Sequence, residues 1–513
     1  MQETTSTFEV DDTGLAAVNE PRDDLVRETA TGPGRFTLDE GPFHTYDRTV
    51  DSVPLDDGRH RVTETVRWRL AIPIWGALFR PLVVRMIRRD SAPDPDADVA
   101  TPWWSPPDRL DARAASVLSR LCVVSMLAGY LGTVITQTIT FAADEFDASD
   151  AAQGNTLAAV RVGVLLSFVL ATMADRRGRR RLLLVCAIGG AVATAAGALA
   201  PNLAVLGATQ TVSRAFSTAL ALLIAVVAAE EMPAGARAYA ASVLAMTAAL
   251  GAGGAVLLLP LADLAEPAWR IVYVVPLLVL PLFLAVGRRI PESKRFARAH
   301  TKVTMAGHRG RLALLAASGF LALAFLSPVS QFQNDFLRDE HGFSALSITI
   351  FTILTNTPAG IGVVVGGRLA DVRGRRLVGA IGTVGGAIFF VLMYQASGPW
   401  LWLTAVIGAI VAAVTVPALG VYGPELFPTS LRGRANGLIT LAGVAGSSVG
   451  LAFAGRMSST FDRWGPGIAM LGVGPLILAA LVIALYPETA HLELEELNPE
   501  DAPATAVVAP PVL

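Results

Sequence analysis

Two arginines, Arg161 and Arg214, each lie near the middle of a long apolar stretch of the sequence. An arginine at the depth of a bilayer core is costly and persists only with a partner or with water. No carboxylate stands at a matching depth, because Asp144, Glu145 and Asp335 fall toward the ends of their stretches. One hypothesis is that Arg214 binds a carboxylate through its planar guanidinium, with Arg161 as a second or purely structural cation. The alternative is that both arginines bond to backbone carbonyls and to Ser, Thr or Asn side chains.

Polar residues recur at helical spacing in several apolar stretches, so each set forms a stripe on one face of a predicted helix. Such stripes face inward whether or not they bind anything, so a single serine or threonine is more often structural. Larger polar side chains are the stronger candidates. With the two arginines, the predicted substrate-binding set is Tyr130, Gln137, Gln210, Gln331, Asn334 and Asn356.

Three charged motifs occur twice, with 195 or 196 positions between the copies. Chance does not produce three repeats in one register, so the chain is predicted to be two similar halves, a known construction of transporters. The paired motifs are Asp175 to Arg180 (DRRGRR) with Asp371 to Arg376 (DVRGRR), Glu230-x-x-Pro233-x-x-x-Arg237 with Glu425-x-x-Pro428-x-x-x-Arg432, and Pro291-Glu292-Ser293 with Pro487-Glu488-Thr489.

Asp175 and Asp371 each follow an apolar stretch, at the carboxyl end of a predicted helix. A negative charge there opposes the helix dipole, so each aspartate gains by pointing at a neighbouring helix N-terminus or an arginine. The two aspartates are therefore predicted to act as latches. The alternative is that the nearby arginines only set membrane topology, but that task needs no aspartate.

Composition places the whole chain among membrane proteins. Its 513 residues are 53% hydrophobic and 16% charged, with a mean hydropathy of +0.51, well above soluble globular proteins. The net charge of −2 gives no reason to expect a nucleic-acid partner. Cys122 and Cys186 lie in apolar runs without metal-type spacing, so neither a metal nor another cofactor is expected. No phosphate-binding loop of the G-x-x-x-x-G-K-[ST] type occurs, so an ATP-driven pump would need a separate subunit. The chain is not expected to be an enzyme.

The apolar stretches are each close to the roughly 20 residues that cross a bilayer core, and only helices fit them because no period-2 pattern is present. The predicted fold is an all-α membrane protein of twelve transmembrane helices in two six-helix halves. The expected domains are 1–112 (N-terminal region), 113–290 (first half), 291–310 (linker), 311–486 (second half) and 487–513 (tail). The predicted spans are 114–141, 152–174, 182–200, 203–228, 238–260, 268–287, 311–335, 345–370, 377–396, 400–424, 434–456 and 464–486.

The hydrophilic N-terminal region shows two local patterns. The stretches 42–50 and 60–70 alternate like paired strands around a turn and predict a hairpin. The stretch 74–89 has helical spacing and several arginines, interrupted by Pro81, and either lies on the membrane surface or packs on the hairpin. A linker is expected from Ser91 to Pro107.

Arginine-rich loops follow the second and eighth predicted spans, while the loops on the opposite side are acidic. By the positive-inside rule, the basic loops and both termini are cytoplasmic. The first twenty-five residues lack the basic start and apolar core of a cleavable signal, consistent with a cytoplasmic N-terminus in a cell-membrane protein.

The segment Gly367 to Arg376 (GRLADVRGRR) resembles the loop motif of the major facilitator superfamily in full, whereas the first copy has Ala171 at the first position. The resemblance covers roughly 114–490, and the Pro291 and Pro487 motifs are similar to those of sugar porters, metabolite:proton symporters and organic ion transporters. It implies a monomer that carries a small-molecule substrate, with protons as coupling ion, and a central cavity between spans 1, 4, 7 and 10. It also implies a gating network between the halves, formed here by Asp175, Arg179, Glu230, Arg237, Glu292, Asp371, Arg375, Glu425, Arg432 and Glu488.

The predicted function is secondary transport of a small organic solute, and the two arginines favour an organic anion. A sugar is less favoured because 327–336 (SPVSQFQNDF) lacks the double-glutamine motif of sugar porters. Organic cation transport, facilitated diffusion, and a non-transporting sensor with the same fold are the alternatives. The glycine pairs Gly362/Gly366 and Gly446/Gly450 allow close helix approach, either for sliding between the halves or for static packing.

Overall fold

The computed structural model describes residues 1–56, 58–88, 105–148, 150–292, 304–333, 336–343 and 345–501, and at a few helix positions the backbone alone. The chain separates into two compact units, Met1–Arg120 and Leu121–Leu513. Most of the linker expected from Ser91 to Pro107 lies outside the described residues.

The first unit is built on a five-stranded antiparallel sheet with the strand order β1-β5-β4-β3-β2. The two stretches predicted to be a hairpin form β4 and β5, but the sequence analysis missed the other three strands and the short helix α1. The elements are β1 (Gln2–Val10), α1 (Asp12–Val18), β2 (Arg27–Gly32), β3 (Arg35–Glu40), β4 (Phe43–Pro54), β5 (His60–Leu70) and α2 (Gly76–Ile87).

One face of this sheet is buried and the other is polar, as strict alternation along β5 requires. Val62, Val66 and Trp68 of β5 are at most 1% exposed. Helix α2 covers part of this face, because its Val83 and Ile87 pack in the same cluster as Trp68. Pro81 lies inside α2 without ending it, so the predicted interruption does not occur.

Charged side chains are also buried under this face. The guanidinium of Arg48 is 0% exposed and bonds Glu28 Oε2 at 2.7 Å and Glu64 Oε1 at 3.0 Å. Arg22 bonds Glu64 Oε2 at 2.8 Å. Burial raises the pKa of Tyr46, so its hydroxyl stays protonated and donates to Glu28 Oε1 at 2.7 Å. Each buried carboxylate therefore has more than one donor, which offsets its desolvation.

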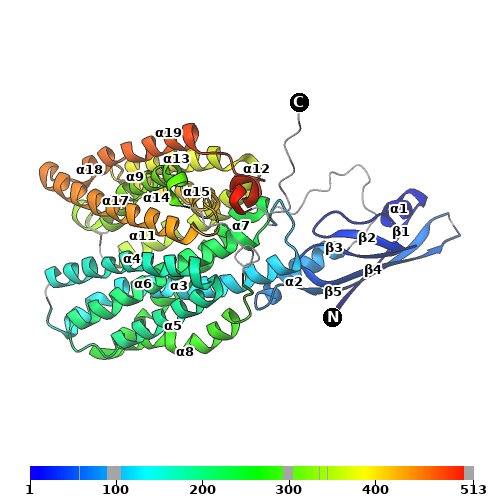
Figure 1. Ribbon diagram of the computed structural model, residues 1–513. Helices are drawn as coiled ribbons and strands as arrows, with labels where there is room; N and C mark the ends of the chain where they lie inside the picture. Colours follow the sequence, from blue (N-terminus) through cyan, green and yellow to red (C-terminus); the bar gives the residue numbers. More distant parts are fainter. Residues whose placement is uncertain are drawn as a thin grey trace. The chain divides into compact units, whose positions relative to one another are not determined.

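The helical elements divide at the linker into a first half, α3 to α8, and a second half, α9 to α19; Figure 1 draws them as two groups, cyan to green and green to red. The first half consists of α3 (Ala112–Glu145), α4 (Asp150–Arg177), α5 (Arg179–Gly197), α6 (Leu203–Glu231), α7 (Arg237–Leu257) and α8 (Arg270–Gly287). The second consists of α9 (Arg309–Gln331), α11 (Ala345–Asn356), α12 (Ala359–Arg373), α13 (Arg375–Met393), α14 (Pro399–Ala413), α15 (Thr415–Gly420), α16 (Tyr422–Glu425), α17 (Arg432–Phe461), α18 (Trp464–Leu471) and α19 (Val473–Leu485), followed by α20 (Leu494–Leu497).

Within the described residues, eleven helical segments are long and apolar enough to cross a membrane, and Ala159–Ala174 of α4 is a shorter apolar segment. The predicted fold of membrane-spanning helices is therefore confirmed, with a sheet in the N-terminal unit, and these segments are consistent with the predicted twelve spans. Some spans are broken: the predicted helix 345–370 is α11 and α12, with Pro358 at the junction, where proline has no N–H to donate.

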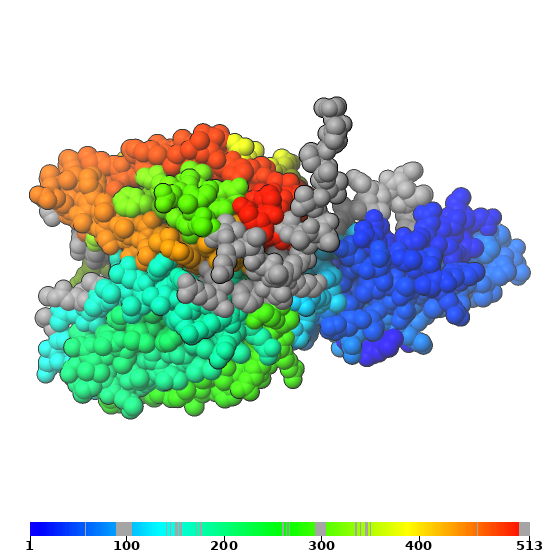
Figure 2. Space-filling model, viewed as in Figure 1, coloured from blue at the N-terminus to red at the C-terminus, as the bar shows by residue number. Residues whose placement is uncertain are grey.

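The halves meet through α4 against α17 and through α7 against α12 and α15. Figure 2 shows the contact of cyan α4 with orange α17 on one face of the molecule. The glycine pairs do not lie at these contacts. Gly362 and Gly366 approach Ile410 and Val414 of their own half, and Gly446 and Gly450 approach α9. Static packing is therefore their role here, and the sliding interpretation is wrong for this conformation.

Candidate functional site

The predicted gating network begins at two equivalent turns, one in each half. Gly178 and Gly374 have φ values of 97° and 95°, in the left-handed region that favours glycine, and each precedes the helix of the next span. The carboxylate of Glu292 accepts the backbone N–H of Arg179 at 2.8 Å, and that of Glu488 accepts the N–H of Arg375 at 2.9 Å. Each glutamate thus caps a helix N-terminus, where a negative charge is stabilising.

Glu230 is the acidic centre of the first copy. Its Oε1 lies 2.8 Å from Arg432 Nη1 of the second half and 3.5 Å from Arg179 Nη2 of its own half. Arg179 Nη2 also donates to the carbonyl of Thr429, 2.7 Å away in the second half. All three charged side chains are 0% exposed. These bonds therefore join the two halves in a water-excluded region.

Glu425 is the equivalent centre in the second copy. It bonds Arg375 of its own half and, at 3.4 Å, Arg237 Nη1 of the first half. Arg375 Nη2 donates to the carbonyl of Ala234 at 3.0 Å, which matches the bond from Arg179 to Thr429. The network consequently has the approximate two-fold symmetry that the sequence repeat implies.

Asp371 joins the halves through a helix N-terminus. Its carboxylate accepts the N–H of Tyr239 at 3.0 Å and that of Ala238 at 3.4 Å, both in the first turn of α7, and bonds Arg375 Nη2 at 3.2 Å. It thus meets both partners proposed for it, a neighbouring helix N-terminus and an arginine. The side chain of its counterpart Asp175 lies outside the described part of the chain.

The segment after the last span adds bonds that the sequence analysis did not anticipate. The carboxylate of Asp501 accepts the N–H and the hydroxyl of Thr429, both at 2.8 Å, and lies 3.3 Å from Arg432 Nη2. Glu493 lies 3.3 Å from Arg237 Nη2 of the first half. The acidic residues of the tail are the signal for these bonds in the sequence, and beyond Glu488 the sequence analysis assigned them no role.

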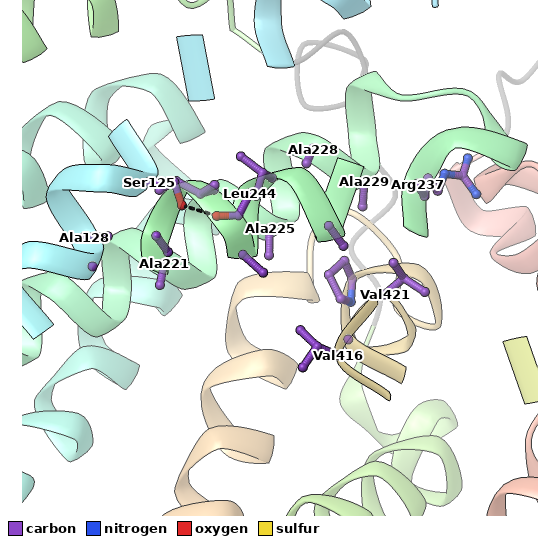
Figure 3. Close-up of a pocket in the computed structure, with 17 residues that line it drawn as sticks. Ser125, Ala128, Ala221, Ala225, Ala228, Ala229, Arg237, Leu244, Val416 and Val421 are labelled. Atoms are coloured by element: carbon purple, nitrogen blue, oxygen red, sulfur yellow. Dashed lines mark hydrogen bonds between the residues drawn. The ribbon is translucent and has the colours of Figure 1, made fainter. Parts of the chain in front are cut away.

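An apolar cavity of about 320 Å³ lies beside this network, between α3, α6, α7 and the segment from Val416 to Pro424. Figure 3 shows alanine side chains along its walls and the hydrogen bond from Ser125 Oγ to the carbonyl of Leu244, 2.8 Å long. Arg237 is the charged residue in its lining, and the guanidinium points away from the other labelled residues, toward Glu425. The cavity therefore offers no free cation for a carboxylate.

The two mid-span arginines come together on the first half. Arg161 of α4 and Arg214 of α6 are both partly buried, and the charge of Arg161 acts on that of Arg214. A Cβ placed on Gly132 of α3 would lie 3.6 Å from Arg214 Nη1, so this guanidinium lies beside α3. Among the described residues neither guanidinium group has a hydrogen bond or an ion pair to the protein. No backbone or side-chain oxygen of the described residues contacts the two guanidinium groups, as the structural alternative would require, and the choice between the two hypotheses stays a prediction.

Two of the predicted binding residues are committed to packing within the first half. Tyr130 donates its hydroxyl to the carbonyl of Val272 at 2.7 Å. Gln210 is 1% exposed and contacts the carbonyl of Thr194 on α5 at 3.5 Å. The expected stripe on α6 thus splits, because Gln210 faces α5 whereas Arg214 reaches α3. The structure does not bring these two residues to the arginines.

The remaining predicted residues are dispersed. Gln137 is partly buried, while Gln331 and Asn356 are exposed at the ends of α9 and α11. Asn334 lies outside the described residues. The arrangement therefore favours a smaller candidate site, centred on Arg161 and Arg214, than the sequence analysis predicted.

Two repeated helical halves in a membrane, joined by a symmetric charged network, define the class of secondary transporters that work by alternating access. The chain belongs to the Major Facilitator Superfamily, whose family model matches residues 121–355 and 312–512. It is a multi-pass membrane transporter and not an enzyme.

Curated relatives agree with this assignment. The chain is 25% identical over 368 residues to the cis,cis-muconate transport protein of Acinetobacter baylyi, covering 65% of this chain and 87% of the relative. It is 28% identical over 283 residues to a putative metabolite transport protein of Haemophilus influenzae, covering 51% and 68%.

Solved structures show the same fold at low sequence identity. The proton:xylose symporter XylE matches with a TM-score of 0.66 and 20% identity over 75% of this chain and 98% of its own. The human organic anion transporter MFSD10 matches with a TM-score of 0.60 and 16% identity over 72% and 99%.

Proposed function

We propose that the protein is a secondary active transporter of an organic anion bearing a carboxylate, and that Arg214 and Arg161 form its anion-binding pair. The observation that carries the proposal is the proximity of two partly buried cations with no acidic partner among the described residues. Like charges at short range in a low dielectric repel each other. A negatively charged substrate would offset the repulsion and provide the partner that both arginines lack among the described residues.

The chemistry of the pair favours a carboxylate. A guanidinium presents two parallel N–H groups that match the two oxygens of a carboxylate, and such charge-assisted pairs are stronger than neutral hydrogen bonds. A sugar hydroxyl would leave both charges uncompensated. The curated relative whose name specifies an anion, cis,cis-muconate, supports the same substrate class.

The proposal includes coupling to protons and residence in the cell membrane with both termini in the cytoplasm. Arginine-rich loops at the gated end support this orientation. A proton that enters with an anion neutralises charge, so coupling would reduce the work done against a membrane potential. No acidic side chain in the middle of a described span identifies the coupling group.

Transport by purified protein in proteoliposomes tests the proposal. Uptake of radiolabelled cis,cis-muconate and other carboxylates should exceed uptake of xylose, and an inward proton gradient should stimulate it. Arg214→Lys keeps the charge but loses the planar fork, so we expect KM for the carboxylate to rise about tenfold, equivalent to about 1.4 kcal/mol. The folded yield should stay near that of the parent protein.

Arg456→Lys is the matched control, because Arg456 is an exposed arginine on α17 of the other half. Its KM should not change. Uptake of a cation or sugar alone, with Arg214→Lys silent, would refute the anion proposal. Complete absence of flux, together with specific binding, would favour the sensor alternative.

A further inference from the structure

Helix α2 exposes an apolar stripe on the side that does not pack on the sheet. Leu78 and Leu82, one turn apart, are 69% and 40% exposed, and Ile74 one turn earlier is 55% exposed. The opposite side holds the buried Val83 and Ile87. The helix is therefore apolar on two faces, and the first unit covers only one of them.

The backbone at the start of this stripe is unfavourable for its residue. Ile74 has φ 71°, in the left-handed region, which is costly for a β-branched side chain. That cost is not recovered by burial within the chain, because the side chain stays more than half exposed. A contact outside the protein would recover it.

The charged residues in the segment that carries the stripe are all arginines. Residues 71 to 88 contain Arg80, Arg85 and Arg88 and no acidic residue, and the three arginines are exposed. Exposed leucines flanked by arginines are the composition of helices that lie in the interface of anionic membranes. A protein partner with an acidic surface would match the charge, but the spanning helices of this chain already place it in a bilayer.

The start of α2 is held against the start of α3 within the same unit. The indole N–H of Trp75 donates to the carbonyl of Ser119 at 3.0 Å, and the hydroxyl of Ser119 bonds the carbonyl of Pro73. Ser119 lies in the first turns of α3, whose residues Ala112–Ile139 form the first candidate span. Two hydrogen bonds thus attach the start of α2 to the start of a membrane-spanning helix. This attachment raises the effective concentration of the membrane surface near the stripe.

We infer that Leu78 and Leu82 of α2, together with Ile74 just before the helix, insert into the headgroup region of an anionic membrane, with Arg80 and Arg85 binding lipid phosphates. The N-terminal unit is then a membrane-surface module that responds to lipid charge. This inference does not depend on which substrate is transported.

Site-directed spin labelling of the full-length protein tests the inference. The native Cys122 and Cys186 are buried, so they are replaced by alanine. A nitroxide is placed at Leu78→Cys or at Thr45→Cys, since Thr45 is exposed on the polar face of the sheet. The protein is reconstituted in nanodiscs of phosphatidylcholine with or without phosphatidylglycerol, and collision rates with oxygen and with a water-soluble nickel chelate are measured.

In anionic nanodiscs the label at 78 should show a several-fold higher oxygen-to-nickel ratio than the label at 45. The ratio at 78 should fall in pure phosphatidylcholine and after Arg80→Glu with Arg85→Glu. An unchanged spectrum of the label at 45 in this variant shows that the sheet remains folded. Equal ratios at 78 and 45 would place the stripe in water, and low collision rates with both reagents at 78 would mean that protein covers it; either result overturns the inference.

Discussion

Single charged residues join the two halves at the predicted gate. The central carboxylates, Glu230 and Glu425, are 0% exposed. Glu230 and Glu425 each bond two arginines, one from each half. Burying such charges is costly, and the cost is offset only while all partners are present. A neutralising substitution should therefore shift the conformational equilibrium more than it affects folding.

Asp371→Asn should favour the state open at this end. The amide keeps one acceptor for the α7 N-terminus but loses the charge that interacts with Arg375 and the helix dipole. A loss of about 1.4 kcal/mol would open the gate about tenfold more often. Alkylation of Ala225→Cys in the apolar cavity measures opening, and Asp147→Asn in an exposed loop is the control. Unchanged alkylation with a normal transport rate would contradict the latch role.

Arg48→Leu should destabilise the N-terminal sheet strongly. It leaves Glu28 and Glu64 buried without their shared cation, and breaking a buried pair costs about 3–5 kcal/mol. Arg27→Leu is the control, because its ion pair with Asp39 is about half exposed and such pairs contribute about 0–1 kcal/mol. Hydrogen exchange of β5 peptides measures the difference. Equal exchange in the two variants would show that the buried cluster does not stabilise the sheet.

At the scale of helices, close glycine contacts assemble each half, and charged contacts join the halves. A Cβ on Gly450 would lie 1.9 Å from the carbonyl oxygen of Ala324, a backbone atom that cannot move without displacing α9. Rigid halves and a breakable polar interface are the properties that alternating access needs.

Gly450→Ala should therefore lower the thermal stability of the protein, with a drop in Tm of several degrees expected for a change of 1–3 kcal/mol from overpacking. Gly455→Ala on the same helix meets nothing within 4 Å. There alanine should be neutral or slightly stabilising, since it favours the helix. Static light scattering during a temperature ramp in detergent measures both. If the two variants melt together, α17 does not pack on α9 this closely.

At the scale of the whole molecule, the arginine-rich loops predict one orientation. A cysteine at Asp147, in the loop between α3 and α4, should react with an impermeant thiol reagent in intact cells. A cysteine at Arg177, beside Gly178, should react only after the membrane is permeabilised. Both positions are exposed on the protein, so access differs only by membrane side. The reverse labelling would overturn the orientation.

The sequence by itself determined the membrane class, the helical spans, the two halves and most of the charged residues that join the halves. These properties are local or repeated. Hydropathy depends only on a window of neighbouring residues, and the two copies of each charged motif can be matched directly in the sequence. The superfamily assignment followed from the same motifs.

Only the tertiary structure decided which side chains meet. It placed Tyr130 and Gln210 in packing contacts and added Asp501 to the charged network that joins the halves. It also built a five-stranded sheet where the sequence indicated a hairpin. The physical reason is that helical spacing shows on which face of a helix a residue lies, but not which element packs against that face. Contacts such as Asp501 with Thr429, or β1 with β5, join positions far apart in the chain, and their pairing depends on how whole elements pack.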